Sequence, residues 1–369
     1  MQVERLMSAH PPSAVTLRRS GRGTRENPVN RFEKIQIEPD ADWNPGDDYG
    51  GRLQGPRTQF FKDNSQTVIA RNDSPDVGFT ASLNPYRGCE HGCIYCYARP
   101  THEFLGFSAG LDFESKIMIK EDAPELLRQE LMSPKWQPQV IFMSGVTDCY
   151  QPVEAKLKLT RRCLEVLVEF RNPVFIITKN HLVTRDVDLF SELARYKAAE
   201  VWLSITTLDP ELRKVMEPRT SPPSARLAAI RELSQAGVPV GVNVAPIIPG
   251  LTDHEMPAIL QAAADAGAKA AGYTVVRLPY GVAPLFEKWL ETHFPDRKEK
   301  VLNRLRPMRY GKLNDSQWGT RMRGEGIFAD QIERMFKVAR RKAGIQGHGG
   351  ELSAAAFRRP PGAQLSLFG

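Results

Sequence analysis

Six apolar stretches in the middle of the chain alternate with segments of helical length, and this alternation is the feature that most restricts the fold. The stretches are rich in valine and isoleucine, as strands of parallel sheets buried on both faces usually are. They lie at residues 78–83, 138–144, 173–178, 200–206, 238–247 and 272–278. We predict an α/β fold with a curved parallel sheet, which either closes fully or stays open as a partial barrel. Functional residues should then gather at the carboxyl ends of the strands.

The segments around this core predict four regions. Residues 1–75 are rich in Arg, Pro, Gly, Asn and Asp, and we expect a flexible N-terminal arm that is either solvated or folds over a bound partner. Residues 76–295 form the expected barrel, and residues 296–346 form a helical annex. Residues 347–369 are rich in Gly, Ala and Pro and predict a flexible tail.

Composition excludes several classes of protein. Among the 369 residues, 41% are hydrophobic and 25% are charged, the balance of a soluble globular protein. No stretch approaches ~18 uninterrupted apolar residues, and the N-terminus has no apolar core of a secretion signal, so we expect no membrane partner. Five cysteines, three of them clustered, do not make a disulfide framework and fit a reducing cytoplasm. The net charge of +7 permits a nucleic-acid partner without requiring one.

The stretch NPYRGCEHGCIYCYARP at residues 84–100 holds the clustered cysteines Cys89, Cys93 and Cys96. Thiolates at this spacing bind soft metals or iron–sulfur clusters. A 4Fe–4S cluster with three protein ligands leaves one iron free to bind another molecule. Two glycines in the stretch, Gly88 and Gly92, would let the backbone wrap closely around such a bulky group.

Two other interpretations of this loop stay open. A structural zinc site prefers four protein ligands, so a zinc ion would have to recruit a fourth ligand such as His91, His102 or Cys149. Alternatively, the three cysteines are merely buried and structural. Three cysteines within eight residues are improbable by chance, which favours the cluster.

The pattern Cys-x3-Cys-x2-Cys, with the aromatic Tyr95 just before its last cysteine, resembles the signature of radical S-adenosylmethionine (radical SAM) enzymes. The wider stretch NPYRGCEHGCIYCYARPTHEF resembles the branch that contains spore photoproduct lyase and related DNA-repair proteins. The resemblance implies a partial (β/α)6 barrel, a 4Fe–4S cluster on the three cysteines, and SAM chelated at the fourth iron. It also implies reductive cleavage of SAM to a 5′-deoxyadenosyl radical by an electron donor such as flavodoxin or ferredoxin, with Tyr95 near the adenine.

Polar residues at other strand ends are candidates for SAM binding. The superfamily often has a Gly-Gly-Glu-like segment after the second strand, where this chain has MSGVTD, so Ser144 is a candidate by position only. Lys179 ends the third strand and suits a SAM carboxylate or a substrate phosphate. Ser204 and Asn243 would face inward if the pleat runs that way. For each of these residues an ordinary polar strand-end role stays open.

Cys149 follows the second strand and should face the mouth of the barrel. Spore photoproduct lyase uses a cysteine as hydrogen-atom donor, but no motif aligns that cysteine with Cys149. A buried, inert cysteine is the simpler interpretation. Several arginines on loops are candidates for gripping phosphates, or else lie on a solvated surface. They are Arg219, Arg226, Arg277, Arg321 and Arg323.

The last residues, Gln364, Leu365, Ser366, Leu367 and Phe368, resemble the pentapeptide by which bacterial repair and replication proteins dock on the DNA sliding clamp. Two leucines and a phenylalanine would fill an apolar groove at the end of a flexible leader. Packing of this end on its own domain is the alternative.

Together these features predict a cytoplasmic radical SAM enzyme that acts on nucleic acid, in particular on DNA in repair. Radical SAM modification of RNA or of a protein is the second hypothesis. A clamp-associated binding protein with a structural or redox-sensing cluster is the third, and SAM cleavage separates it from the other two.

Overall fold

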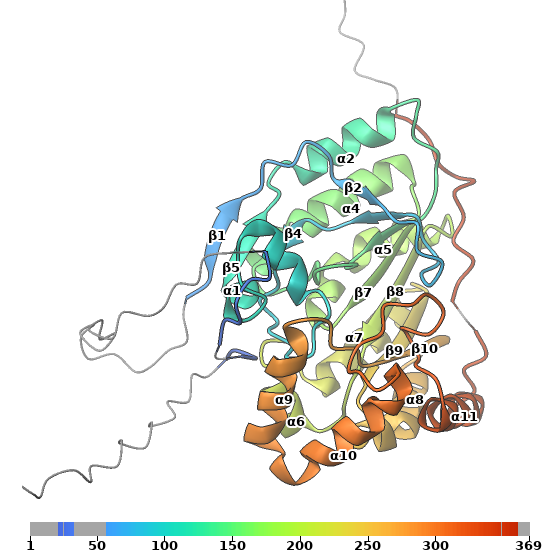
Figure 1. The fold of residues 1–369 in the computed structure, drawn as a ribbon. Coiled ribbons are helices and arrows are strands. Elements are labelled where there is room, and N and C mark those ends of the chain that lie inside the picture. The colour runs from blue at the N-terminus through green and yellow to red at the C-terminus, as the bar shows by residue number, and fades with distance from the viewer. Residues whose placement is uncertain (1–20, 25, 33–56, 348, 361–369) are drawn as a thin grey trace, which may run out of the picture.

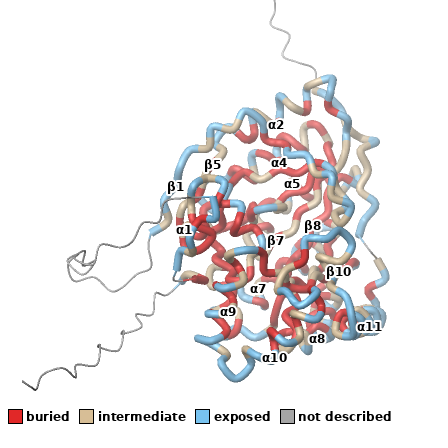
Figure 2. Tube along the Cα trace, viewed as in Figure 1, coloured by how far each residue is buried: buried red, intermediate tan, exposed pale blue. Residues whose placement is uncertain are grey.

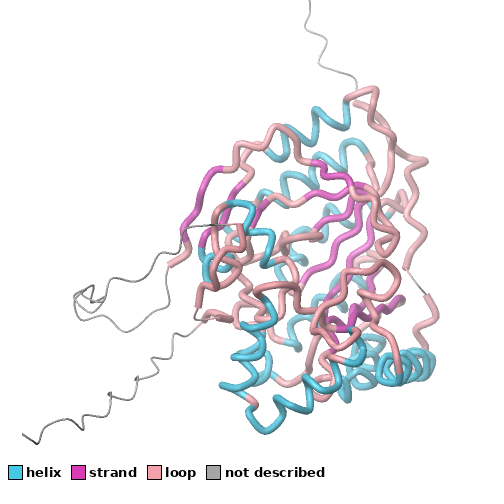
Figure 3. The backbone as a smooth tube through the Cα atoms, in the orientation of Figure 1, coloured by secondary structure: helices cyan, strands magenta, loops and turns pink. Residues whose placement is uncertain are grey.

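The computed structural model describes residues 21–24, 26–32, 57–347 and 349–360, and its centre is a seven-stranded sheet (Figures 1 and 3). The strand order is β10-β9-β8-β7-β6-β3-β2, and every pairing is parallel except that of β2 with β3. The strands are β2 (Ile69–Arg71), β3 (Ala81–Leu83), β6 (Ile141–Met143), β7 (Val174–Thr178), β8 (Ala199–Ser204), β9 (Val240–Ile247) and β10 (Ala270–Val275). The six predicted strands are therefore confirmed. The sheet ends at β10 and β2 without closing, so the barrel is partial.

Helices connect these strands and pack along one face of the sheet. They are α2 (Ala123–Met132), α3 (Glu154–Leu157), α4 (Leu159–Phe170), α5 (Val187–Ala194), α6 (Pro210–Met216), α7 (Pro223–Gln235) and α8 (Met256–Asp265), with short 3-10 helices η2 (His181–Asp186) and η3 (Asp253–Glu255). Helix α7 contacts β8 and β9, and α8 contacts β9. Buried residues concentrate between this helical layer and the sheet (Figure 2).

The two faces of the sheet carry different side chains. Val240, Val242 and Val244 alternate along β9 on the helix-covered face and are buried. The opposite face carries a row of aromatic rings across neighbouring strands, in which Phe175 contacts both Phe142 and Trp202. Such cross-strand contacts fix the strand register, because a slip of one residue would exchange the two faces.

A second, three-stranded sheet joins the N-terminal part of the chain to the barrel. Its strands are β1 (Gln59–Lys62), β4 (Tyr86–Arg87) and β5 (Lys116–Ile119), and helices η1 (Arg99–Leu105) and α1 (Leu111–Ser115) lie between β4 and β5. Strand β1 pairs with β5, and β2 pairs with β3. The expectation of a flexible arm is therefore wrong for the described end of this segment, residues 57–75. Local composition did not indicate order here because the partners of these strands lie elsewhere in the chain.

The predicted helical annex consists of α10 (Pro295–Leu305), η4 (Pro307–Arg309) and α11 (Ile327–Lys342), preceded by α9 (Val282–His293). Helix α11 packs against α8, and its Phe336 contacts the Tyr273 ring of β10 with centroids 4.6 Å apart. Within the described residues, no helix combines the length and apolar character that crossing a membrane requires.

The described part of the tail, residues 349–360, also differs from the expected flexible segment. It crosses the amino ends of the strands and continues to the ends of α4 and α2 (Figure 1). Gly350 donates to Glu200 at 3.0 Å, Arg358 donates through its amide to Phe170 at 2.9 Å, and Arg359 donates to main-chain carbonyls after α2. Residues 361–369, with the predicted clamp motif, lie outside the described residues.

Gly241 tests the packing of the aromatic face. A Cβ at this position would lie 2.5 Å from the Trp202 indole, and β9 is paired on both sides and cannot move away. We expect Gly241→Ala to lower the free energy of unfolding by about 1–3 kcal/mol, measured by urea denaturation. The control is Gly78→Ala, where an added Cβ meets no atom within 4 Å. Equal stability of the two variants would contradict this packing.

Candidate active site at the carboxyl ends of the strands

The cysteine loop lies between β4 and η1, at the carboxyl end of the neighbouring β3. Gly88 and Gly92 have φ of 79° and 66°, a conformation that glycine adopts without strain, so the chain turns sharply on either side of Cys89. The Cys89 amide donates to the Phe113 carbonyl at 2.9 Å, and the Cys96 amide donates to Cys93 at 3.2 Å. These bonds hold the loop in a fixed shape.

A buried ion pair supports the same loop. Arg99 is fully buried and donates to the Cys93 carbonyl at 3.0 and 2.9 Å and to Glu114 at 2.5 Å. Glu114 in turn accepts from the amides of Gly23 at 2.8 Å and Thr24 at 3.1 Å. These bonds hold the backbone of Gly23 and Thr24 against the cysteine loop. A Cβ on Gly23 would overlap the Gly92 carbonyl. Only glycine permits this approach.

The three thiols have raised pKa values. Burial is the main cause for each, and for Cys89 and Cys93 the neighbouring cysteines and a nearby acidic side chain add to it. Three adjacent thiolates would therefore be unstable here without a cationic group, and binding to iron or another metal supplies such a charge. The donor set is soft and sulfur-only, which fits an iron–sulfur cluster.

The zinc interpretation concerns how closely possible ligands converge. Among the described residues, no three His, Cys, Asp or Glu side chains converge closely enough to hold one metal ion, as a tetrahedral zinc site requires. A four-iron cluster is much bulkier and keeps its cysteines farther apart. Of the proposed fourth ligands, His91 lies 3.3 Å from Asp148, and His102 packs between Phe107 and Phe113, where burial lowers its pKa to about 4.

Tyr95 and Lys179 meet at a buried carboxylate that the sequence analysis missed, Glu217. The Tyr95 hydroxyl donates to Glu217, and Lys179 Nζ lies 3.1 Å from the same carboxylate. Lys179 Nζ also donates to Thr206 at 3.0 Å and to the Ala245 carbonyl at 2.8 Å. The predicted cation at the end of β7 is thus paired within the protein.

Arg226 completes this network from α7. It is buried, pairs with Glu217 and donates to the Ser204 carbonyl at 2.9 Å. The prediction that Arg226 grips phosphate on an open loop is therefore wrong. Burial alone would raise the pKa of Glu217, but Arg226 and Lys179, together with hydrogen bonds from Tyr95 and Thr206, hold that pKa well below its usual range.

Ser204, the last residue of β8, is the register partner of Asn243 in the middle of β9. Asn243 is half-buried on the same face as Gly272, since its side-chain oxygen lies 3.6 Å from a Cβ placed there. Ser204 is buried. The structure therefore brings both residues to the same edge of the sheet as Lys179.

Ser144 and Cys149 form a separate pair after β6. The Ser144 hydroxyl donates to Cys149 Sγ at 3.2 Å and accepts from the Cys149 amide at 3.1 Å. Ser144 has a positive φ of 78°. Cys149 is fully buried, and its pKa is raised well above the ordinary value, first by burial and then by Asp148. The Cys149 side chain is consequently a neutral thiol.

Asp148 links this pair to Lys179 and was also missed. It accepts from the Lys179 amide at 2.8 Å and from the Thr178 hydroxyl at 2.7 Å. Burial would raise its pKa, but His91 and these hydrogen bonds lower it below the ordinary value. The position of an acidic residue directly after the predicted strand, in MSGVTD, was the available signal. Glu217 follows a helix, and its sequence context gave no signal that it belongs to the site.

The other candidate arginines are dispersed. Arg219 pairs with Glu90 at 3.2 Å, Arg321 with Asp76 at 2.5 Å, and Arg323 lies over Tyr273 with its charge exposed. Arg277 stacks on Tyr97 at 4.7 Å, next to Cys96. Arg277 and Arg219 are therefore the two candidates placed against the cysteine loop, Arg219 through Glu90 and through a bond from its amide to the His91 carbonyl at 3.3 Å.

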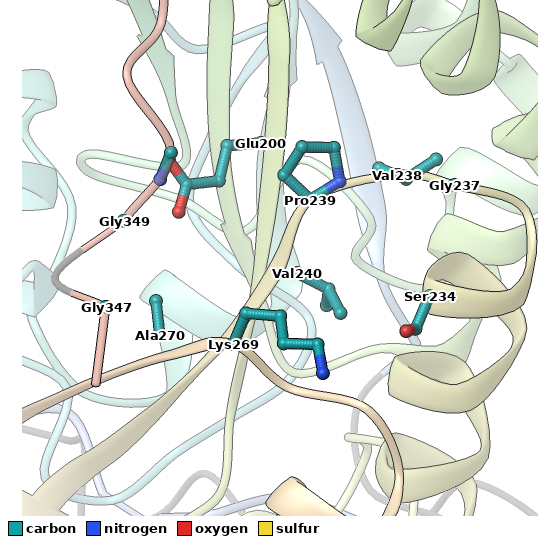
Figure 4. Close-up of a pocket in the computed structure, with 11 residues that line it drawn as sticks. Glu200, Ser234, Gly237, Val238, Pro239, Val240, Lys269, Ala270, Gly347 and Gly349 are labelled. Carbon is teal, nitrogen blue, oxygen red and sulfur yellow. The ribbon is translucent and has the colours of Figure 1, made fainter. Parts of the chain in front are cut away.

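A cavity of about 380 Å³ lies at the opposite end of the barrel. Figure 4 shows Glu200, Val240 and Ala270 at the amino ends of β8, β9 and β10, with Gly347 and Gly349 of the tail beside them. This cavity is separated from the cysteine loop by the length of the strands, so it is not part of the candidate site.

Comparisons with known proteins agree with this geometry. Residues 83–263 match the model of the Radical SAM superfamily. An uncharacterized protein of Mycobacterium tuberculosis is 36% identical over 220 residues, which are 59% of this chain and 65% of the relative. A radical SAM Nalpha-GlyT isomerase of Pseudomonas phage M6 is 24% identical over 205 residues, 55% of this chain and 40% of the relative. The chain thus spans less than two thirds of the length of these relatives.

Among solved structures, spore photoproduct lyase complexed with dinucleoside spore photoproduct is similar in fold. The TM-score is 0.52 at 16% sequence identity, and the match covers 78% of this chain and 79% of that protein. This similarity supports the predicted fold.

Glu217→Gln tests the buried network. Removing one charge of a buried pair leaves Arg226 and Lys179 uncompensated, so we expect a loss of about 3–5 kcal/mol in unfolding free energy at pH 7. Because the folded-state pKa is lowered, this contribution is present above the ordinary pKa of 4.5 and is lost as the pH falls below it. Denaturant unfolding at pH 7 and pH 4 should therefore show a smaller difference at pH 4.

The control is Glu211→Gln, which removes an exposed pair with Lys214 and should change stability little. A difference between Glu217→Gln and the unmodified protein that is the same at both pH values would contradict the assigned charge of Glu217.

Proposed function

We propose that this protein is a radical SAM enzyme that holds a 4Fe–4S cluster on Cys89, Cys93 and Cys96, because residues 83–263 match the model of the Radical SAM superfamily. The observation that carries the proposal is the three-cysteine loop at the carboxyl ends of a parallel, partly closed sheet. When bound, the reduced cluster supplies one electron that cleaves SAM to methionine and a 5′-deoxyadenosyl radical, which takes a hydrogen atom from the substrate. A low-potential donor such as flavodoxin or ferredoxin would supply the electron.

The residues of the chain bind and orient in this proposal. Tyr95 is fixed by Glu217 and Thr206, so its ring stands in one place for packing near the adenine. Ser204 at the end of β8 and its register partner Asn243 on β9 are our candidates for contacts to SAM. The Lys179 ammonium is already paired with Glu217, so we assign Lys179 chiefly to positioning Tyr95 rather than to carrying a free charge toward SAM.

Ser144 is our remaining candidate for a SAM contact, since its positive φ turns the chain at the end of β6. The hydrogen-donor role of Cys149 stays a prediction. Its thiol is buried and bonded to Ser144, so that bond would have to open before the thiol reached a substrate radical.

We propose nucleic acid, and DNA in repair in particular, as the substrate class. The support is the fold shared with spore photoproduct lyase, the net charge of +7 and the aromatic and arginine side chains beside the cysteine loop. Radical SAM modification of RNA or of a protein is the second candidate. Docking of the end of the chain on the bacterial sliding clamp, through Gln364, Leu365, Ser366, Leu367 and Phe368, stays a prediction.

The cluster is tested by single Cys→Ala changes. Protein prepared without oxygen should contain about four irons in one cluster and absorb in the visible range. Alanine at Cys89, Cys93 or Cys96 should remove this iron, because each supplies one ligand. The matched control is Cys163→Ala, since Cys163 is fully buried in α4 away from the loop. Iron analysis and absorption spectra measure the outcome.

With dithionite as reductant, the intact protein should convert SAM to 5′-deoxyadenosine, and the three loop variants should not. Chromatography of the products decides this. A colourless protein with one bound zinc would overturn the proposal, and intact SAM over a fully reduced cluster would favour a structural or redox-sensing cluster in a clamp-associated binding protein.

A further inference from the structure

Four exposed aromatic side chains lie on the cysteine loop, on the helix η1 that follows it, and on two segments that meet η1 at Arg31. Phe32, Tyr97, Phe104 and Tyr280 are 54%, 47%, 71% and 65% exposed, and we call them the aromatic rim. Thirteen of the aromatic side chains in the described ranges are buried in the core instead. Aromatic side chains left in water at one place are typical of a binding surface.

Two arginines hold the aromatic rim together. The Arg31 guanidinium lies 3.8 Å from the Tyr280 ring centroid, 4.7 Å from that of Phe32 and 5.6 Å from that of Phe104. The rings of Phe32 and Phe104 lie 4.8 Å apart. Arg277 lies over Tyr97 at 4.7 Å. The rim is therefore ordered by cation–π contacts while its rings stay open to solvent.

The rim is continuous with the candidate active site. Tyr97 follows Cys96 directly, and its hydroxyl donates to the Gly145 carbonyl at 2.7 Å. Tyr280 lies three residues after Arg277 in the loop that follows β10. Phe104 belongs to η1, which begins three residues after Cys96, and Arg31 lies against both Phe104 and Tyr280, so a molecule on these two rings would lie against the helix that follows the cysteine loop.

The charge of the rim is positive but small. Arg31 pairs with Glu103 at 2.8 Å, and Arg321 pairs with Asp76 at 2.5 Å. Arg277 forms no ion pair within the part of the chain that the structure describes. A surface of this kind offers ring faces more than charge, so a partner must supply flat rings and a modest number of negative charges.

We propose that the aromatic rim binds unpaired nucleotides, by stacking bases on Phe104, Tyr280 and Phe32 and placing phosphates near Arg31 and Arg277. Stacking on aromatic rings and arginine planes is the common way in which proteins hold single strands. Bases of an intact duplex are already stacked on each other and cannot reach these rings. The inference rests on the proposed function, in which a nucleic acid enters the barrel mouth, and names the state of that substrate as single-stranded or extruded.

The experiment measures binding of a fluorescein-labelled oligothymidylate of about 12 nucleotides to the full chain by fluorescence anisotropy. A blunt duplex of the same length and an oligouridylate serve as the other two probes. We expect the single strands to bind at least tenfold more tightly than the duplex. Phe104→Ala and Tyr280→Ala should each weaken single-strand binding about tenfold, because each removes one stacking ring.

Tyr310→Ala is the matched control. Tyr310 is an equally exposed tyrosine, 56%, but it is bonded to Glu325 beyond α10 and lies outside the rim. Its loss should leave single-strand binding unchanged. Phe104→Trp should retain binding, because an indole also stacks. Circular dichroism of each variant checks that the fold is kept.

Two outcomes would overturn the inference. Equal affinity of Phe104→Ala, Tyr280→Ala and the unmodified protein would show that the rings make no contact with the strand. A steep loss of affinity with salt, together with equal binding of duplex and single strand, would indicate a phosphate-only surface. Comparing the affinity for the oligouridylate with that for the oligothymidylate shows whether the protein distinguishes RNA from DNA.

SAM cleavage by the same variants separates this inference from the proposed function. The unmodified protein could form 5′-deoxyadenosine without nucleic acid while Phe104→Ala and Tyr280→Ala bind the single strand as tightly as it does. This result would reject strand binding by the aromatic rim and leave the proposed function standing. Absence of SAM cleavage in the unmodified, cluster-loaded protein would reject the proposed function, whatever the strand binding shows.

Discussion

The buried carboxylate of Glu217 is the interaction on which the arrangement of the candidate site depends. It accepts from Tyr95 of the cysteine loop, pairs with Lys179 at the end of β7, and pairs with Arg226 of α7. Through these partners it reaches the carbonyls of Ser204 on β8 and Ala245 on β9. Four separate parts of the chain therefore meet at one negative charge. Any rearrangement would leave charged groups unpaired in the interior, which is costly, so the site is held in one geometry.

The same arrangement pairs the two cations that balance Glu217 within the protein. The neutral thiol of Cys149 and the half-buried Asn243 add polar groups without charge. Access for a large partner is left to the rim, where Tyr97 and Tyr280 remain exposed. In the proposed function, the target of a radical formed in the barrel would approach from the aromatic rim.

The sequence predicted the periodic parts of the structure and failed where order depends on distant partners. The six strands were found because valine-rich runs such as residues 173–178 pack under helices, and burial of this kind leaves a local pattern. The three cysteines and Tyr95 could be proposed as site residues because their spacing is local. Glu217 and Arg226 could not be found, since neither is near Tyr95 in sequence and their role appears only when α7 packs against the sheet. The position of Lys179 directly after β7 could be predicted from the sequence, but its pairing with Glu217 could not.

The two segments expected to be flexible show the physical reason for this failure most clearly. Both are poor in apolar residues, and in both the described part docks through its backbone. The amides of Gly23 and Thr24 bond to Glu114, and the amide of Gly350 bonds to Glu200. Main-chain amides are present in every sequence, so composition cannot show that a buried carboxylate elsewhere awaits them. Glycine serves at both places because the backbone must come close: a Cβ on Gly349 would lie 3.1 Å from Glu200, and one on Gly23 would overlap the cysteine loop. The barrel therefore orders its own flanks, one over the cysteines and one over the amino ends of the strands.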